Sequence, residues 1–77
     1  MKELVEVIAK SLVDHPDEVV VTERESDRTL IVELTVAKSD MGKVIGKKGR
    51  IAKAIRSVVK AAAIRADKRV VVEIAEE

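Results

Sequence analysis

Hydrophobic residues recur at helical spacing at the start of the chain and alternate in a strand-like manner further on. In residues 2–13, Leu4, Ile8 and Leu12 stand four positions apart with Val5 beside them, which predicts an amphipathic helix. The segment 14–17 (Asp-His-Pro-Asp) ends this helix, because the residue before a proline avoids the α conformation. We therefore expect His15 to be a turn residue rather than a metal ligand or a catalytic group.

Three segments have the pattern of β-strands. Residues 18–24 are β-branched, a polar turn follows at 25–27, and residues 28–37 alternate. One face of this second segment carries Leu30, Val32, Leu34 and Val36, and the other carries Thr29, Ile31, Glu33 and Thr35. The two segments are expected to form a hairpin with one buried face. Residues 70–74 predict a last strand, with Val70, Val72 and Ile74 facing inward.

Two helices are expected between the second and third strands. Ser39 or Asp40 is expected to cap a short helix over residues 40–45, and a longer helix should occupy residues 50–65. The core stripe predicted for the longer helix consists of Ile51, Ile55, Val58 and Ala62. Residues 67–69 form a connector. The order is α-β-β-α-α-β, the fold class is α+β, and residues 1–77 form a single domain.

Charge is distributed unevenly along a chain whose net charge is only +1. Residues 1–37 hold 4 basic and 9 acidic side chains, and residues 70–77 add 3 acidic ones. Residues 38–69 hold 11 basic and 2 acidic side chains, a local net charge of +9. One strongly basic segment favours a local site for a polyanion, although a solvated helix face would have the same composition.

The amino-acid composition excludes several kinds of site. The chain has no cysteine and a single histidine, so we expect no disulfide, no thiolate metal site and no metal or other cofactor. It also has no Phe, Trp or Tyr, which excludes nucleic-acid sites built on aromatic stacking. A nucleic-acid site here would have to use backbone, aliphatic and basic groups.

All three glycines fall within residues 42–49. The turn Gly46-Lys47-Lys48-Gly49 follows an apolar helix end and precedes the next helix. Glycine at both ends of the turn lets a phosphate chain lie against the main chain, and the two lysines place cations beside it. The free N–H groups at the start of the next helix point to the same place.

The alternative is an ordinary glycine-rich turn between helices with solvated lysines. G-x-x-G by itself is a weak pattern, but its flanking Val44-Ile45 and Ile51 favour a functional turn. Arg50 and Lys53 extend the positive surface. At about 100° per residue, Lys53, Arg56 and Lys60 form one basic stripe that leads away from the turn.

The apolar arc of the helix at 50–65 is wider than the roughly 100° needed to pack on one sheet. Beyond the core stripe it includes Ala52, Val59, Ala63 and Ala66, and Ile64 lies separately among polar positions. The excess predicts a dimer seam, since symmetric dimers are common. The alternative is that the alanines only favour helix formation.

Catalysis and membrane insertion are not expected. A Walker A loop needs G-x-x-x-x-G-K-[ST], whereas only three residues separate Gly42 from Gly46, and Lys48 stands where Ser or Thr would bind magnesium. Sequence context gives no serine a base, so we expect no enzyme. No apolar run approaches the roughly 20 residues that span a bilayer, and no secretory signal is evident. We expect a cytoplasmic protein without a membrane partner.

Residues Val44 to Ile51, together with Ala54-Ile55, resemble the core signature of KH domains. The α-β-β-α-α-β order resembles the type II KH arrangement over the whole chain. The length and the residues Asp40 to Gly46 before the turn are similar to those of the bacterial KhpA (YlqC) family. The resemblance implies a three-stranded mixed sheet covered on one face by helices.

The resemblance also implies a function. KH domains hold about four single-stranded nucleotides with the G-x-x-G turn on the backbone. The site residues carried over are Ile45, Gly46, Lys47, Lys48, Gly49, Arg50, Ile51 and Lys53, with Ile45 and Ile51 under the bases. The family implies an RNA chaperone or post-transcriptional regulator linked to cell elongation, division and hence cell shape.

The expected partners follow from the same resemblance. They are single-stranded RNA and either a second copy of the chain or a KH protein of the Jag/KhpB type. An alternative function remains open, in which the KH fold serves mainly as a dimerisation scaffold in a protein-interaction subunit. In that alternative, surface changes at Val59 and Ala63 should matter and the glycine turn should not.

Overall fold

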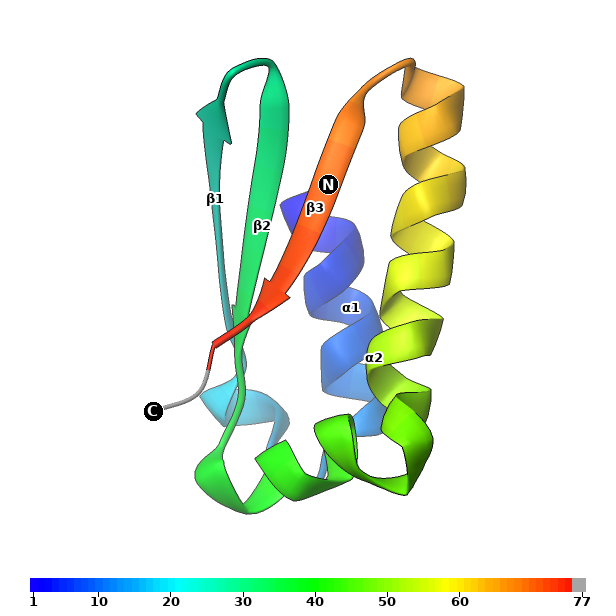
Figure 1. Cartoon of the computed structure of the whole chain (residues 1–77). Coiled ribbons are helices and arrows are strands. Elements are labelled where there is room, and N and C mark those ends of the chain that lie inside the picture. Colours follow the sequence, from blue (N-terminus) through cyan, green and yellow to red (C-terminus); the bar gives the residue numbers. More distant parts are fainter. Residues whose placement is uncertain (76–77) are drawn as a thin grey trace.

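A three-stranded sheet with helices on one face forms the molecule. The computed structural model describes residues 1–75, apart from the side chains of Lys47 and Lys48. The elements in chain order are α1 (Lys2–Leu12), the 3-10 helix η1 (Pro16–Glu18), β1 (Val20–Ser26), β2 (Thr29–Thr35), α2 (Lys38–Ala66) and β3 (Arg69–Ile74) (Figure 1). The predicted α+β class and the three-stranded mixed sheet are confirmed.

The first strand of the hairpin ends two residues later than the sequence pattern indicated. β1 pairs antiparallel with β2 until Ser26 faces Thr29, so Asp27 and Arg28 alone make the turn. Their φ angles are 49° and 65°. A two-residue turn with two positive φ angles matches the twist of the strands, and Asp enters this left-handed region more readily than most residues. Because Pro16 begins a 3-10 helix, β1 also starts at Val20 rather than at residue 18.

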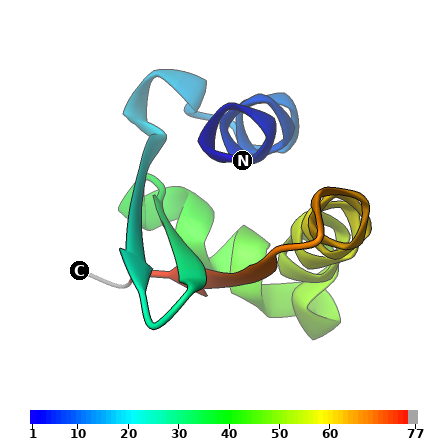
Figure 2. The same ribbon diagram turned by 90° about the horizontal axis from the view of Figure 1, so that it is seen from above.

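β2 is the central strand and carries much of the core. It pairs with β1 on one side and runs parallel to β3 on the other, with Val32 opposite Val72. Val32 and Leu34 are fully buried, and Val36 nearly so, whereas the residues between them stay partly exposed. The predicted alternation of residues 28–37 is therefore confirmed. Both long helices lie on the buried face of the sheet (Figures 1 and 2).

α1 forms where predicted, but its buried stripe is shifted by one residue. Val5, expected beside the stripe, and Ala9 are fully buried, whereas Leu12 is exposed. The expected Leu4 and Ile8 are only half-buried at the edge of the stripe. The small side chain of Ala9 faces the core, and the larger side chains of Leu4 and Ile8 lie beside the buried stripe.

α2 joins the two predicted helices into one helical span. The turn expected at 46–49 belongs to this span, but Gly49 has φ 64° and interrupts the regular geometry. The chain changes direction there: the first part of α2 crosses the end of the sheet, and the longer second part runs beside β3 (Figure 1). The predicted change of direction is present, but without a separate loop.

The predicted core stripe of α2 is confirmed at Ile55, with Ile51 packed against the core, but its phase was wrong further along the helix. The buried residues are Ala52, Ile55, Val59 and Ala63. Val58, expected in the core, is exposed. When apolar residues cover a broad arc of a helix, the sequence gives the spacing of the buried residues. It does not show which part of the arc faces the sheet. Val59 and Ala63 are therefore buried in the chain itself, whereas Ile64 and Ala66 of the predicted dimer seam are exposed.

The predicted side-chain cap of α2 was also wrong. Ala37 precedes the helix and no side chain caps it. Asp40 is instead buried, with 1% of its surface exposed, and its carboxylate accepts hydrogen bonds from two backbone N–H groups. Its Oδ1 lies 3.1 Å from the nitrogen of Asp14, and its Oδ2 lies 3.0 Å from the nitrogen of His15. Lys43 Nζ is 3.1 Å from Asp14 Oδ1 on the outside of the same junction.

His15 stands immediately before η1, as the predicted turn residue. Within residues 1–75, neither α1 nor α2 contains a stretch with the length and hydropathy that a bilayer crossing requires.

Candidate functional site

The two glycines of the turn have different structural requirements. Gly49 has φ 64°, a conformation that costs other L-residues about 1–2 kcal/mol. Gly46 has no positive φ, and a Cβ atom at this position would meet nothing within 4 Å. Nothing packed against Gly46 in the chain therefore requires glycine there. The missing side chain leaves open main-chain surface at the bend of α2.

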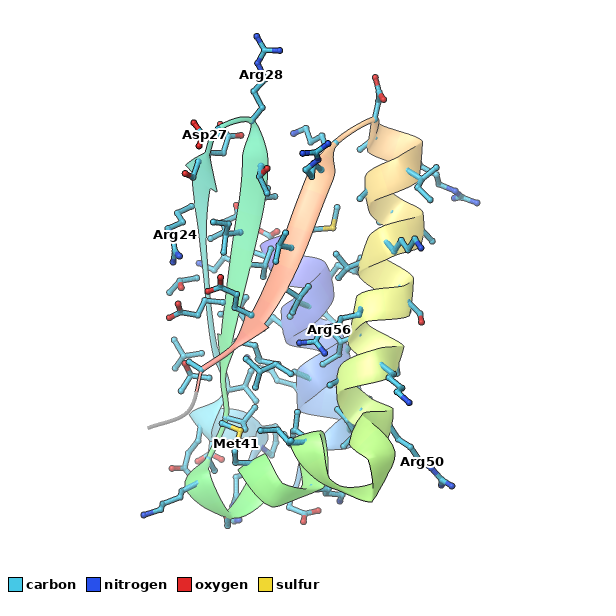
Figure 3. The ribbon with its side chains drawn as sticks, viewed as in Figure 1. Arg24, Asp27, Arg28, Met41, Arg50 and Arg56 are labelled. Carbon is cyan, nitrogen blue, oxygen red and sulfur yellow. The ribbon has the colours of Figure 1, made fainter. Side chains whose placement is uncertain are left out.

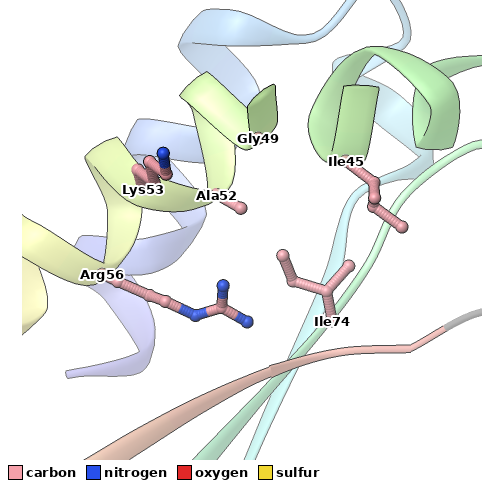
Figure 4. Close-up of a pocket in the computed structure, with 6 residues that line it drawn as sticks. All are labelled: Ile45, Gly49, Ala52, Lys53, Arg56 and Ile74. Atoms are coloured by element: carbon pink, nitrogen blue, oxygen red, sulfur yellow. The ribbon is translucent and has the colours of Figure 1, made fainter. Parts of the chain in front are cut away.

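A hollow of about 380 Å³ lies beside this bend. Its lining residues come from both parts of α2 and from the end of β3: Ile45, Gly49, Ala52, Lys53, Arg56 and Ile74 (Figure 4). The side chains of Ile45 and Ile74 point toward the same space from opposite elements. Ile45 is 45% exposed although it is aliphatic, so its apolar surface is available in the hollow.

The rim of the hollow is cationic. Lys53 and Arg56 are exposed and lie on the second part of α2. Arg56 extends toward β3, whereas Arg50 points away from the sheet (Figure 3). Among the residues whose side chains the structure describes, the ion pairs involve none of Arg50, Lys53, Arg56 and Lys60. These charges are thus available to an external anion.

The structure brings together part of the predicted site. Ile45, Gly49 and Lys53 line the hollow, and Gly46 lies on the same bend. Arg50 is exposed but outside the lining, and Ile51 is half-buried against the core. The side chains of Lys47 and Lys48 lie outside the described part of the chain.

Three lining residues were absent from the predicted site. Ile74 comes from the last strand, where its alternation indicated only an inward position. Ala52 was assigned to a dimer seam, and Arg56 was expected only in the basic stripe. The stripe was the useful signal for Arg56, since its spacing from Lys53 places both on one side of α2. Ile74 lies near the glycine turn because β3 returns beside β2 after α2. A sequence pattern within a few residues cannot reveal this contact.

The arrangement is suited to holding a flexible polyanion. Aliphatic side chains offer a floor for flat, weakly polar groups, and the exposed main chain at the bend admits a backbone at close range. The cations on the rim add charge-assisted contacts that do not depend on a single geometry. Among the lining residues that the structure describes, no pair of side chains combines a nucleophile with a base.

Comparison with known proteins identifies relatives over nearly the whole chain. The family described as KhpA/KhpB, KH domain, matches residues 2–74. The RNA-binding protein KhpA of Clostridium acetobutylicum is 68% identical over 74 residues, which cover 96% of this chain and 99% of that protein. The RNA-binding protein KhpA of Listeria monocytogenes is 54% identical over 76 residues, covering 99% of this chain and all of that protein.

A solved structure supports the fold. A crystal structure of Era in complex with MgGDPNP and nucleotides 1506–1542 of 16S ribosomal RNA superposes with a TM-score of 0.67 at 24% identity. The match covers 95% of this chain but 28% of the Era chain, so it concerns one part of that protein. With the family match over residues 2–74 and relatives of nearly the same length, the chain belongs to the KhpA/KhpB family of KH domains.

Proposed function

We propose that this chain is an RNA-binding protein that holds about four single-stranded nucleotides at the bend of α2. The observation that carries the proposal is the hollow itself, where an open glycine turn, an aliphatic floor and the exposed cations Lys53 and Arg56 meet. The sugar-phosphate backbone lies against Gly46–Gly49, and the bases lie over Ile45 and Ile74. Relatives of nearly the same length are named RNA-binding proteins, which supports the same function.

Fluorescence polarisation of a labelled single-stranded RNA tests the proposal. The variant Lys47→Asp/Lys48→Asp reverses two charges in the turn and should abolish binding. The matched control is Arg65→Asp/Lys68→Asp, which makes the same charge change at the far end of α2 and should retain most of the affinity. Wild-type log K should fall by about 0.7 per phosphate contact for each tenfold increase in salt.

Two results would overturn the proposal. Equal binding by the wild type and the folded turn variant would exclude the turn as the site. Absence of binding by the wild type at micromolar concentration would exclude the function. Competition by DNA of the same sequence then measures the preference for RNA, which the proposal takes from the family and not from any residue that contacts a 2′-hydroxyl.

The family resemblance extends the proposal to the cellular role. The chain acts in the cytoplasm as an RNA chaperone or post-transcriptional regulator without catalytic activity, in a process linked to cell elongation and division. A strand-annealing assay with a quenched RNA hairpin measures chaperone activity directly. Annealing at the uncatalysed rate, under conditions where the protein is bound, would remove this part of the proposal.

A partner chain belongs to the proposal as well. A site for four nucleotides without aromatic stacking binds weakly, so a second KH unit, either another copy or a KhpB-type protein, adds avidity. Exposed aliphatic side chains at Val7, Val58 and Ile64 favour such a contact. They equally favour the second candidate function, a dimerisation scaffold. Sedimentation of the wild type and of Val58→Asp separates an associating chain from a monomeric one.

A further inference from the structure

β1 forms the edge of the sheet opposite to β3. The strand order is β1-β2-β3, and within residues 1–75 no helix or strand lies beyond β1 (Figures 1 and 2). The strand is seven residues long, and all of its residues except the buried Val21 are exposed. Its register with β2 runs without a bulge from Val20 to Ser26. An edge of this kind can pair with a further strand along its whole length.

Every second residue of β1 directs its main-chain polar groups away from β2. Ser26 and Thr29 flank the two-residue turn and form the hydrogen-bonded pair that closes it. Hydrogen-bonded and non-hydrogen-bonded pairs alternate in an antiparallel ladder, so Val21, Glu23 and Glu25 present their N–H and C=O groups to the free side. In the part of the chain that the structure describes, no main-chain group outside the sheet bonds to them. The free side therefore offers a row of donors and acceptors to an added strand.

The side chains along this edge are acidic. Glu23 and Glu25 are exposed on β1, and η1 adds two exposed carboxylates immediately before the strand. Arg24, the only cation of β1, has its guanidinium 3.5 Å from a glutamate of β2 and 3.7 Å from a glutamate of β3. The sheet itself thus compensates the charge of Arg24. The edge keeps a negative charge that favours a strand with Lys or Arg side chains, because opposite charges stabilise cross-strand pairs.

The same charges disfavour a second copy of β1 as the added strand. An antiparallel pairing of two copies centred on Arg24 would place Arg24 opposite Arg24 and Glu23 opposite Glu25. A pairing centred on Glu23 would place this glutamate opposite itself. Like charges directly opposite each other destabilise a sheet. The edge therefore selects against self-pairing and in favour of a basic segment from another protein.

We propose that β1 is a docking edge for an extended basic segment of a partner protein, which adds a strand to the sheet. The segment pairs antiparallel, the slightly more stable arrangement, with the main chain of Val21, Glu23 and Glu25. Its Lys or Arg side chains lie opposite the two glutamates, and the residues between them lie beside Val20 and Thr22 on the open face. Because this edge is across the sheet from the hollow at the glycine turn, the site is separate from the proposed RNA site.

Binding of a short labelled peptide tests this proposal. The probe alternates lysine and valine over about eight residues, so one face of its extended form is basic. One control peptide carries N-methyl groups on its lysine amides, which keeps the charge but removes the donors that would face β1. A second control peptide has glutamate in place of each lysine. The wild type should bind the probe at least about tenfold more tightly than either control, measured by fluorescence polarisation.

Two protein variants separate the edge from general charge. Glu23→Gln/Glu25→Gln removes both carboxylates from β1 and should weaken binding of the probe by about fivefold or more. Asp14→Asn/Asp67→Asn makes the same charge change outside β1 and should leave the affinity within about twofold of the wild type. Thermal melts verify that both variants are folded. Equal losses in the two variants would overturn the role of the edge.

Amide hydrogen exchange of the wild-type chain locates the bound peptide. The N–H groups of Val21, Glu23 and Glu25 should exchange at least about tenfold more slowly with saturating probe. Those of Thr22 and Arg24 already bond to β2 and should not change. Slower exchange without this alternation, or equal binding of the probe and its N-methylated control, would overturn the proposal. Absence of probe binding at about 1 mM peptide would overturn it as well.

Discussion

The buried carboxylate of Asp40 should be among the most sensitive positions for stability. It joins the first part of α2 to the segment after α1 through the backbone N–H groups of Asp14 and His15. Asp40→Ala removes two hydrogen bonds to a charged acceptor and leaves two partly buried donors without their partner. Each such bond contributes about 1.5–3 kcal/mol, so a total loss of about 3 kcal/mol is expected for donors that water reaches in part. In a domain of this size that lowers the Tm by about 12–24 °C.

Thermal and urea unfolding followed by circular dichroism measure this effect. Asp40→Asn keeps one acceptor oxygen but turns its NH₂ group toward the second donor, so about half of the loss should remain. The control is Asp14→Ala, which breaks only the exposed pair with Lys43 and should cost less than about 1 kcal/mol. A loss below 1 kcal/mol in Asp40→Ala, or equal losses in Asp40→Ala and Asp14→Ala, would refute the reasoning.

Three further predictions concern the turn, the core and the surface. Gly49→Ala should lower the free energy of unfolding by about 1–2 kcal/mol, because φ is 64° at this position. Gly46→Ala should be as stable as the wild type but should bind RNA more weakly. Chemical denaturation measures the stability of both variants, and fluorescence polarisation measures their binding. Leu34→Ala, at a fully buried position, should lower the free energy of unfolding by about 2–5 kcal/mol. Ile64→Ala, at a position 70% exposed, should lower it by less than about 0.5 kcal/mol in the same denaturation experiments. Arg24→Ala breaks two exposed ion pairs to glutamates and should lower the free energy of unfolding by less than about 1 kcal/mol. The stability difference from the wild type should become smaller at high salt, which screens exposed charges.

The strands were the most predictable part of the fold. A period of two leaves only two possible faces, and the run from Leu30 to Val36 names the inner one without ambiguity. The turn at Asp27-Arg28 was missed because the polar residues before it also suit a turn, and only the pairing of Ser26 with Thr29 decides between them. Backbone geometry across two strands, not composition, settles that position.

For the helices, unlike the strands, the buried face was harder to predict than the element itself. Their existence was clear from the period, but the stripe that faces the sheet was misassigned in α2. Alanines and valines surround this helix on more than one side, so its rotation depends on close packing that no single-helix projection contains. Gly49 also interrupts the helix, which separates the phase of the second part from that of the first. Asp40 was expected at a cap because capping is local, whereas its real partners lie 25 and 26 residues away.

The candidate site combines one local motif with one long-range contact. The glycine turn and the basic stripe are readable in sequence because each lies on consecutive turns of α2. The apolar floor is not, since Ile74 reaches Ile45 only through the parallel pairing of β3 with β2. Position within the sheet therefore decides which aliphatic residues become binding surface.

Binding should depend on shape and charge far more than on base identity. The described lining of the hollow is aliphatic and basic, and the chain contains no aromatic ring to stack on a base. Stacking contributes about 1–3 kcal/mol per base where it occurs, so its absence removes the largest source of affinity that does not depend on salt. What remains is phosphate contact, which grows with the number of cations along the path. A chain built in this way gains affinity when a second RNA-binding domain holds the same strand, because the second contact then forms at a high effective concentration.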